Sequence, residues 1–185
     1  MLGRMRLLLV SAALLLATAT RAQDFKPTGE VQFLASGSSS SSASFDDARV
    51  VGPLVNMTRR ADATWAGDLK RRDYDLHVED GHLHGPNFDL HVTTKDGKTS
   101  VRGLVDGKRL TFEMDEKGLN ARFGACSLDM LSKGPGFFQG EVGCVFRKGG
   151  LPSTGQAGLR FSGAAAAFPP PAVQTALALA AVLPG

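Results

Sequence analysis

The chain has four histidines, all within one stretch of fifteen residues, and imidazole nitrogens are common ligands for transition-metal ions. Two carboxylates lie among them, which gives these candidate ligands: His77, Glu79, His82, His84, Asp89 and His91. Imidazoles with a carboxylate suit Zn²⁺, Cu²⁺ or Ni²⁺ better than Ca²⁺ or Mg²⁺, which prefer oxygen ligands. The residue types therefore predict a transition-metal site, provided that the fold brings them to one face.

Strand periodicity would bring these side chains to one face. Every second residue from 74 to 78 is apolar, and the residues between them are polar. Asp80-Gly81 separates this run from the next one and is typical of a two-residue type I′ hairpin turn. Such a turn fixes the register and places these residues opposite each other: Glu79 and His82, and His77 and His84.

A second tight turn at Pro86-Asn87 extends the same polar face onto a third strand. The apolar residues of that strand would be Phe88, Leu90 and Val92. The polar face then carries two rows, His77/His84/Asp89 and Glu79/His82/His91. Directly opposed residues have Cβ atoms about 5 Å apart, close enough for two imidazoles to share a metal ion with Glu79 or Asp89. The alternative is that these histidines are solvated residues of a hydrophilic face.

The same alternation and turn chemistry continue along the chain. Further turns are predicted at Asp96-Gly97, Asp106-Gly107 and Lys117-Gly118, and a glycine recurs at intervals of about 20 residues, at Gly67, Gly85, Gly103 and Gly124. We interpret each of these glycines as the end of one repeat of the strand-and-turn pattern. The predicted fold is all-β: an antiparallel meander of repeated hairpins forming a curled sheet or a barrel, with a short C-terminal helix.

The two cysteines are expected at inward positions of adjacent strands. Folding a hairpin around Lys133–Gly136 pairs Cys126 with Cys144, Leu128 with Val142, and Met130 with Gly140. In an oxidising compartment, two cysteines placed in this way predict a disulfide between Cys126 and Cys144.

Residues 1–22 are typical of a secretory signal peptide. They combine two arginines near the start, an apolar run over residues 7–17, and small residues at Ala19 and Ala22 where cleavage would occur. We therefore expect a periplasmic, cell-surface or extracellular protein, with no transmembrane span after cleavage.

The charge balance argues against a nucleic-acid partner. The chain has 21 Lys and Arg against 18 Asp and Glu, and residues 1–22 hold three arginines and no acidic residue. Removing them leaves 18 charges of each sign, so the basic character belongs to the leader. Lys70-Arg71-Arg72 is the one basic run that stays, and we expect it at a solvated turn.

Residues 23–163 are predicted to form the β-meander domain. Its first strand is expected at Glu30–Ala35, followed by a flexible serine-rich loop over residues 36–44. The next strand is expected over residues 48–57. It is interrupted by Gly52-Pro53, which suits a bulge or an edge strand because proline cannot donate to a strand ladder.

Residues 164–185 form an alanine- and proline-rich tail, in which residues 172–183 predict a short apolar helix that plugs or flanks the sheet. Leu151–Gly155 resembles the sortase sorting motif of Gram-positive surface proteins, although the continuous hydrophobic stretch and basic tail of that pattern do not follow. Ser162–Ala164, with the apolar tail after it, resembles a glycolipid-anchor signal.

The sequence contains no nucleophile elbow, phosphate loop, dinucleotide fingerprint or zinc-protease helix motif, so an enzyme is the less favoured class. Two hypotheses stay open. The chain is an exported non-catalytic β-module, structural or binding, which takes a small apolar ligand or an envelope partner. Alternatively, it is a metal-binding or metal-dependent protein that uses the histidine patch.

Overall fold

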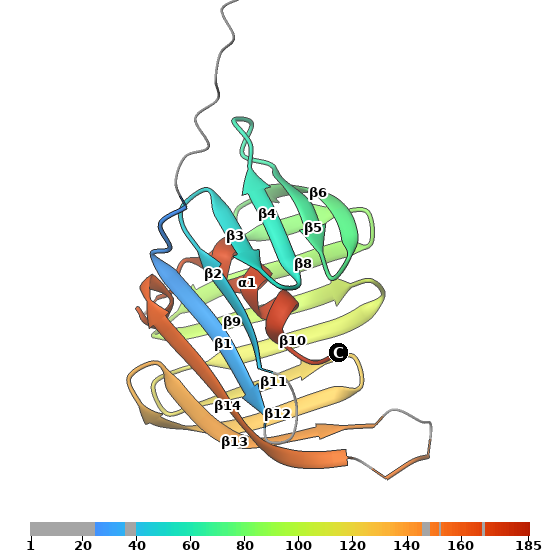
Figure 1. Cartoon of the computed structure of the whole chain (residues 1–185), viewed down its shortest axis with the longest axis vertical. Coiled ribbons are helices and arrows are strands. Elements are labelled where there is room, and N and C mark those ends of the chain that lie inside the picture. Colours follow the sequence, from blue (N-terminus) through green and yellow to red (C-terminus); the bar gives the residue numbers. More distant parts are fainter. Residues whose placement is uncertain (1–24, 36–39, 146–148, 152, 168) are drawn as a thin grey trace, which may run out of the picture.

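Fourteen antiparallel strands form a closed barrel in which each strand pairs with its neighbours along the chain (Figure 1). The computed structural model describes residues 25–35, 40–145, 149–151, 153–167 and 169–185. The barrel closes where the first strand pairs with the last, with Val31 opposite Phe161. The predicted all-β meander with a short C-terminal helix is confirmed, and the choice between curled sheet and barrel is resolved as a barrel.

The strands are joined mainly by short hairpin connections. Their bounds are β1 Gly29–Ala35, β2 Ser41–Phe45, β3 Arg49–Gly52, β4 Val55–Arg59, β5 Trp65–Leu69, β6 Arg72–Glu79, β7 His82–Gly85, β8 Phe88–Lys95, β9 Lys98–Val105, β10 Lys108–Met114, β11 Gly118–Phe123, β12 Cys126–Gly134, β13 Phe137–Cys144 and β14 Ser153–Gly163. A 3₁₀ turn, η1 (Ala164–Ala166), and one helix, α1 (Ala172–Val182), follow.

The predicted two-residue turns are present between β6 and β10. Asp80 and Gly81 have φ of 47° and 77°, as a type I′ turn requires, and the Asp96-Gly97 and Asp106-Gly107 turns have the same signs. Asn87 has a φ of 59° in the predicted turn after Pro86. These turns fix the register of the strands that carry the histidines.

The serine-rich segment is partly a strand, which corrects the prediction of a flexible loop over residues 36–44. Residues 36–39 lie outside the described residues, but Ser41–Phe45 forms β2 and pairs with β1. Ladder hydrogen bonds use the backbone alone, so serines do not prevent pairing where Ala43 and Phe45 can be buried.

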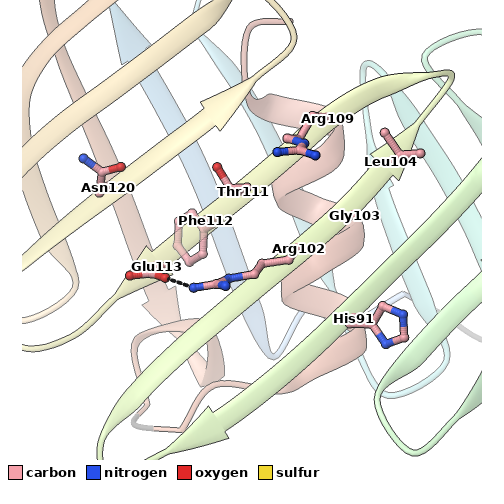
Figure 2. Close-up of a pocket in the computed structure, with 9 residues that line it drawn as sticks. All are labelled: His91, Arg102, Gly103, Leu104, Arg109, Thr111, Phe112, Glu113 and Asn120. Atoms are coloured by element: carbon pink, nitrogen blue, oxygen red, sulfur yellow. Dashed lines mark hydrogen bonds and ion pairs between the residues drawn. The ribbon is translucent and has the colours of Figure 1, made fainter.

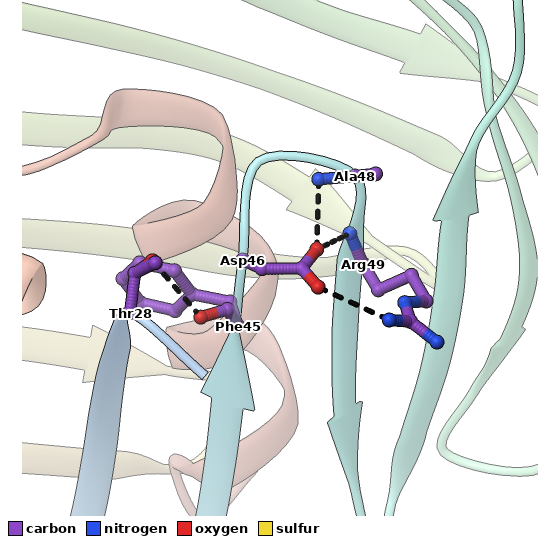
Figure 3. A network of polar contacts seen from close by, with 5 residues as sticks. All are labelled: Thr28, Phe45, Asp46, Ala48 and Arg49. Carbon is purple, nitrogen blue, oxygen red and sulfur yellow. Dashed lines mark hydrogen bonds and ion pairs between the residues drawn. The ribbon is translucent and has the colours of Figure 1, made fainter. Parts of the chain in front are cut away.

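An aspartate side chain shapes the turn from β2 to β3 (Figure 3). Asp46 Oδ1 accepts hydrogen bonds from the backbone N–H groups of Ala48 and Arg49 at 2.9 and 2.7 Å, and Arg49 pairs with Oδ2 at 3.3 Å. On the adjoining segment, the Thr28 hydroxyl donates to the Phe45 carbonyl at 3.2 Å. An aspartate that bonds backbone groups two and three residues ahead is a recurrent turn former.

An aspartate side chain also shapes the turn between β10 and β11, and this turn lies one residue before the predicted Lys117-Gly118 turn. Asp115 Oδ1 accepts from the backbone N–H groups of Lys117 and Gly118 at 2.8 and 3.0 Å, and these bonds lower the pKa of Asp115. The turn residues are consequently Glu116 and Lys117, with Met114 opposite Leu119.

The segment over residues 48–57 is a hairpin, so the prediction of one strand interrupted at Gly52-Pro53 was wrong. Gly52 pairs with Val55, and Pro53 and Leu54 form the turn between β3 and β4. A proline that cannot donate to the ladder fits a turn as well as a bulge, and Gly52 is packed too closely for a side chain, with its Cβ position 2.3 Å from the Ser42 carbonyl oxygen.

Two of the periodic glycines lie inside strands and do not end a repeat. Gly67 in β5 and Gly103 in β9 have φ of 142° and 153°. A Cβ at these positions would lie 2.0 Å from the Asn56 oxygen and 1.9 Å from the Asp89 oxygen of the neighbouring strands. Glycine is needed there because the backbones approach so closely, and it leaves a gap in the row of side chains.

The hairpin of β12 and β13 has the predicted register and carries a disulfide. Cys126 lies opposite Cys144, and their sulfurs are bonded. Leu128 lies opposite Val142, and the ladder shifts by a bulge between Ser132 and Gly134. The disulfide indicates a non-reducing environment.

The helix α1 fills the interior of the barrel (Figure 1). Every residue from Thr175 to Leu183 is buried, and the helix contacts β1, β2, β3 and β8. A helix that is apolar on all sides is stable only where all sides are buried, so the barrel interior and the helix require each other. The tail therefore plugs the sheet, and its apolar side chains fill the interior of the barrel.

The two segments that resemble processing signals join this closed structure. Ser153–Gly155 belongs to β14 and pairs with β13, while Pro152 lies outside the described residues and Leu151 is exposed. Ser162 and Gly163 end β14, and the apolar tail after them is the buried α1.

Residues 1–24, with the predicted signal peptide, also lie outside the described residues. None of the helices in the described part of the chain is long and apolar enough to cross a membrane.

Candidate metal centre

The predicted pairing of the histidine strands is confirmed. In the ladder between β6 and β7, His77 lies opposite His84 and Glu79 lies opposite His82. Between β7 and β8, His82 lies opposite His91, while His84 lies opposite Asp89. All six predicted residues therefore lie on the outer face of three consecutive strands, opposite to the buried Leu76, Leu83 and Leu90.

Three of these residues bring their ligand atoms together: His82, Asp89 and His91, each offering one atom within 4.8 Å of the others. Asp89 Oδ1 lies 3.0 Å from His82 Nε2 and 3.5 Å from His91 Nε2. Around a tetrahedral ion with bonds of 2.0 to 2.1 Å, neighbouring ligand atoms are separated by about 3.3 Å. The two carboxylate–imidazole distances already lie on either side of this value.

The carboxylate of the cluster is reached along a diagonal of the sheet. Asp89 lies opposite His84 in the ladder, yet its oxygen contacts His82, two residues away on the same strand as His84. Diagonal neighbours are within reach of long side chains, and strand twist decides which diagonal is short. Glu79 lies directly opposite His82 but contributes no atom to the cluster.

The four imidazole rings form one continuous array. The rings of His82 and His91 are stacked, with centroids 3.9 Å apart and planes 12° apart. His84 lies 4.8 Å from His82, and His77 lies 5.5 Å from His84. His77 and His84 are thus neighbours of the three-residue cluster without belonging to it.

The cluster is partly open to solvent. The side chains of His82, Asp89 and His91 are 33%, 56% and 60% exposed. Three protein ligands leave a fourth position of a tetrahedral ion free for a solvent molecule or a small ligand. An ion bound here would consequently be accessible from outside the barrel.

A hollow of about 680 Å³ adjoins the cluster and shares His91 with it (Figure 2). It lies over β8 to β11 and is lined by His91, Arg102, Gly103, Leu104, Arg109, Thr111, Phe112, Glu113 and Asn120. Arg102 and Leu104 are the outward residues of β9 in this lining, whereas Gly103 lies between them at an inward register position, opposite Leu90 and Leu110. Figure 2 shows Arg109, Thr111 and Glu113 along one strand, with Arg102 and His91 on the neighbouring strands.

The predictions from sequence did not include this hollow, although its signal was present. The Asp96-Gly97 turn alone places Arg102 opposite His91, and the Asp106-Gly107 turn places Thr111 opposite Arg102. Extending the predicted register from β8 to β9 and β10 would therefore have placed His91, Arg102 and Thr111 side by side on the outer face.

Of the charged residues that line the hollow, Glu113 and Arg102 form ion pairs with described residues and Arg109 does not. Glu113 accepts hydrogen bonds from Lys98 and Arg102, and these bonds lower the pKa of Glu113. Arg109 forms no ion pair with any described residue. Arg102 is 67% exposed, so its contact with Glu113 is a surface ion pair that a ligand can displace at small cost.

Comparison of this chain with protein-family models, with curated proteins and with solved structures found no match. A functional assignment therefore depends on the geometry and chemistry of the chain's own residues.

Proposed function

We propose that this chain is an exported, non-catalytic β-barrel module that binds a divalent transition-metal ion at His82, Asp89 and His91. The observation that carries the proposal is the convergence of two imidazole nitrogens and one carboxylate oxygen within 4.8 Å of one another. This donor set suits Zn²⁺, Cu²⁺ or Ni²⁺.

Export is supported by two independent features. The Cys126–Cys144 disulfide requires a non-reducing environment, and residues 1–22 have the composition of a secretory leader. The module would then work in the cell envelope or outside the cell. Its lumen is filled by α1, so binding would occur on the outer face.

Metal binding should depend on pH through the two imidazoles. Only neutral imidazole coordinates a metal ion, so protons compete with the metal for the ring nitrogens and the metal affinity should be lower in acid. The same protonation favours the direct ion pairs with Asp89, which use the oxygen that the metal needs. Affinity should therefore rise from pH 5.5 to pH 7.5.

Calorimetric titration of the tag-free protein with zinc at pH 7.5 tests the proposal. We expect one saturable site of micromolar or tighter affinity in the parent, and none in the His82→Ala, His91→Ala double variant. His77→Ala is the matched control, because it removes an imidazole of the same array outside the cluster and should leave the affinity within about twofold. Equal binding in the parent and the double variant would disprove the site.

A further inference from the structure

The hollow next to the metal cluster combines cationic, polar and apolar groups. Arg109 and Arg102 supply guanidinium groups, Thr111 and Asn120 supply uncharged hydrogen-bonding groups, and Leu104 supplies an apolar side chain that is 45% exposed. Glu113 is the one carboxylate of the lining, and it is already hydrogen-bonded to Lys98 and Arg102. Arg109 is thus the cation left for a ligand.

The size of the hollow fits a small molecule. Its volume of about 680 Å³ lies within the range of roughly 300 to 1,000 Å³ that small-molecule sites occupy. Guanidinium groups bind carboxylate and phosphate oxygens in a bidentate manner, which gives both affinity and geometric selectivity. The lining therefore favours a small oxyanion with a short carbon skeleton that can lie against Leu104.

We propose that this hollow binds a small molecule that carries a carboxylate or phosphate group. Its oxyanion pairs with Arg109 and Arg102, and an oxygen of the same ligand fills the free coordination position of the metal at His91. The contact with the metal rests on the function proposed above, whereas the contacts with the arginines do not. His91 joins the two sites because it belongs to the cluster and lines the hollow.

The arginine contacts are tested first without metal. Succinate and glycerol phosphate serve as probes of the carboxylate and the phosphate source, and binding is followed by the ¹H–¹⁵N signals of the arginine side chains. We expect saturable shifts of Arg102 and Arg109, and an affinity about tenfold lower in Arg109→Gln, as is typical for the loss of a charged hydrogen-bonding partner. The probe that binds more tightly identifies the source of the oxyanion.

Arg122→Gln is the matched control. Arg122 lies opposite Thr111 on the same outer face and carries the same charge, but it does not line the hollow. Its replacement should change the affinity by less than about twofold. Equal losses in Arg109→Gln and Arg122→Gln, or no saturable shift with either probe, would overturn the proposal, because the anion would then respond only to surface charge.

The titration is then repeated with one equivalent of zinc. Zinc should raise the affinity for the better probe several-fold in the parent but not in His91→Ala. Specific binding at Arg109 that zinc does not alter would overturn the link to the metal. The zinc calorimetry separates the two failures, because a protein that binds no zinc can still bind the probe at the arginines.

Discussion

The interior of the barrel and the outer face of β6, β7 and β8 differ in how far the requirements of folding explain which residues are present. The interior holds apolar side chains and the apolar α1, and closing a barrel around a helix requires such residues. The outer face carries all four histidines of the chain within three strands. Strand formation does not require imidazoles at these positions, so their concentration is the more informative feature for function.

This difference predicts a separation of effects. Substitutions of inward residues should change the free energy of unfolding and leave the outer ligand sites intact while the protein stays folded. Substitutions in the outer cluster should abolish metal binding with little effect on stability.

Leu177→Ala should lower the free energy of unfolding by about 2 to 5 kcal/mol, because it leaves a cavity in α1 where the barrel packs around it. Denaturant unfolding measures the loss. Leu131→Ala is the control: Leu131 is 64% exposed on β12, so the same substitution should change stability by less than about 0.5 kcal/mol. Similar losses at the two positions would show that α1 does not plug the barrel.

Replacing Cys126 and Cys144 together by alanine should lower the free energy of unfolding by about 3 kcal/mol. The disulfide closes a segment with a sequence separation of 18, and loop-closure entropy gives roughly that value for such a length. The measurement is denaturant unfolding of both proteins. Thiol titration of the denatured, unreduced parent should detect no free thiol, and two free thiols would contradict the disulfide.

Lys70, at one end of the barrel, should make the free energy of unfolding depend on pH. Its ammonium group donates to the Leu183 carbonyl at 2.9 Å, and burial, with a smaller contribution from Lys108, lowers the pKa of Lys70 to about 8. Between this value and its ordinary 10.5, the unfolded chain binds more protons than the folded chain, so the free energy of unfolding should rise as pH increases.

Lys70→Met should remove this rise between pH 8 and pH 10, as measured by denaturant unfolding at each pH. Lys133→Met is the control, because Lys133 is exposed in the turn region of β12 and its substitution should leave the slope of the parent unchanged. A parent whose stability falls over this range as steeply as that of Lys70→Met would contradict the burial of the amine.

Local turn chemistry explains why much of the register could be predicted. A two-residue turn such as Asp80-Gly81 or Asp106-Gly107 allows only one register between the flanking strands. The register, together with the alternation along each strand, determines which side chains point inward and which point outward. The pairing of Cys126 with Cys144 followed in the same way across a longer turn. Each of these predictions needed only two segments that are adjacent in the sequence.

Non-local features could not be predicted in this way. Closure depends on the pairing of β1 with β14, which lie at opposite ends of the sheet, and an apolar helix is compatible with plugging or flanking. In the candidate site, the register allowed Glu79 or Asp89 as the oxygen ligand. The choice of Asp89 depends on sheet twist and side-chain reach, which the alternation of polar and apolar residues does not contain.

The smallest effect on stability is expected for the outer cluster. Without metal, the His82→Ala, His91→Ala double variant should unfold within about 0.5 kcal/mol of the parent, because exposed side chains and surface ion pairs contribute little. With zinc at a hundred times its dissociation constant, the parent should gain about 2.7 kcal/mol, because an ion that binds only the folded state shifts the unfolding equilibrium by mass action. The double variant should gain nothing, and the thermal unfolding of both proteins with and without zinc measures the difference. A double variant that is several kcal/mol less stable without zinc would mean that the histidine array serves the fold itself, and the contrast between interior and outer face would not hold.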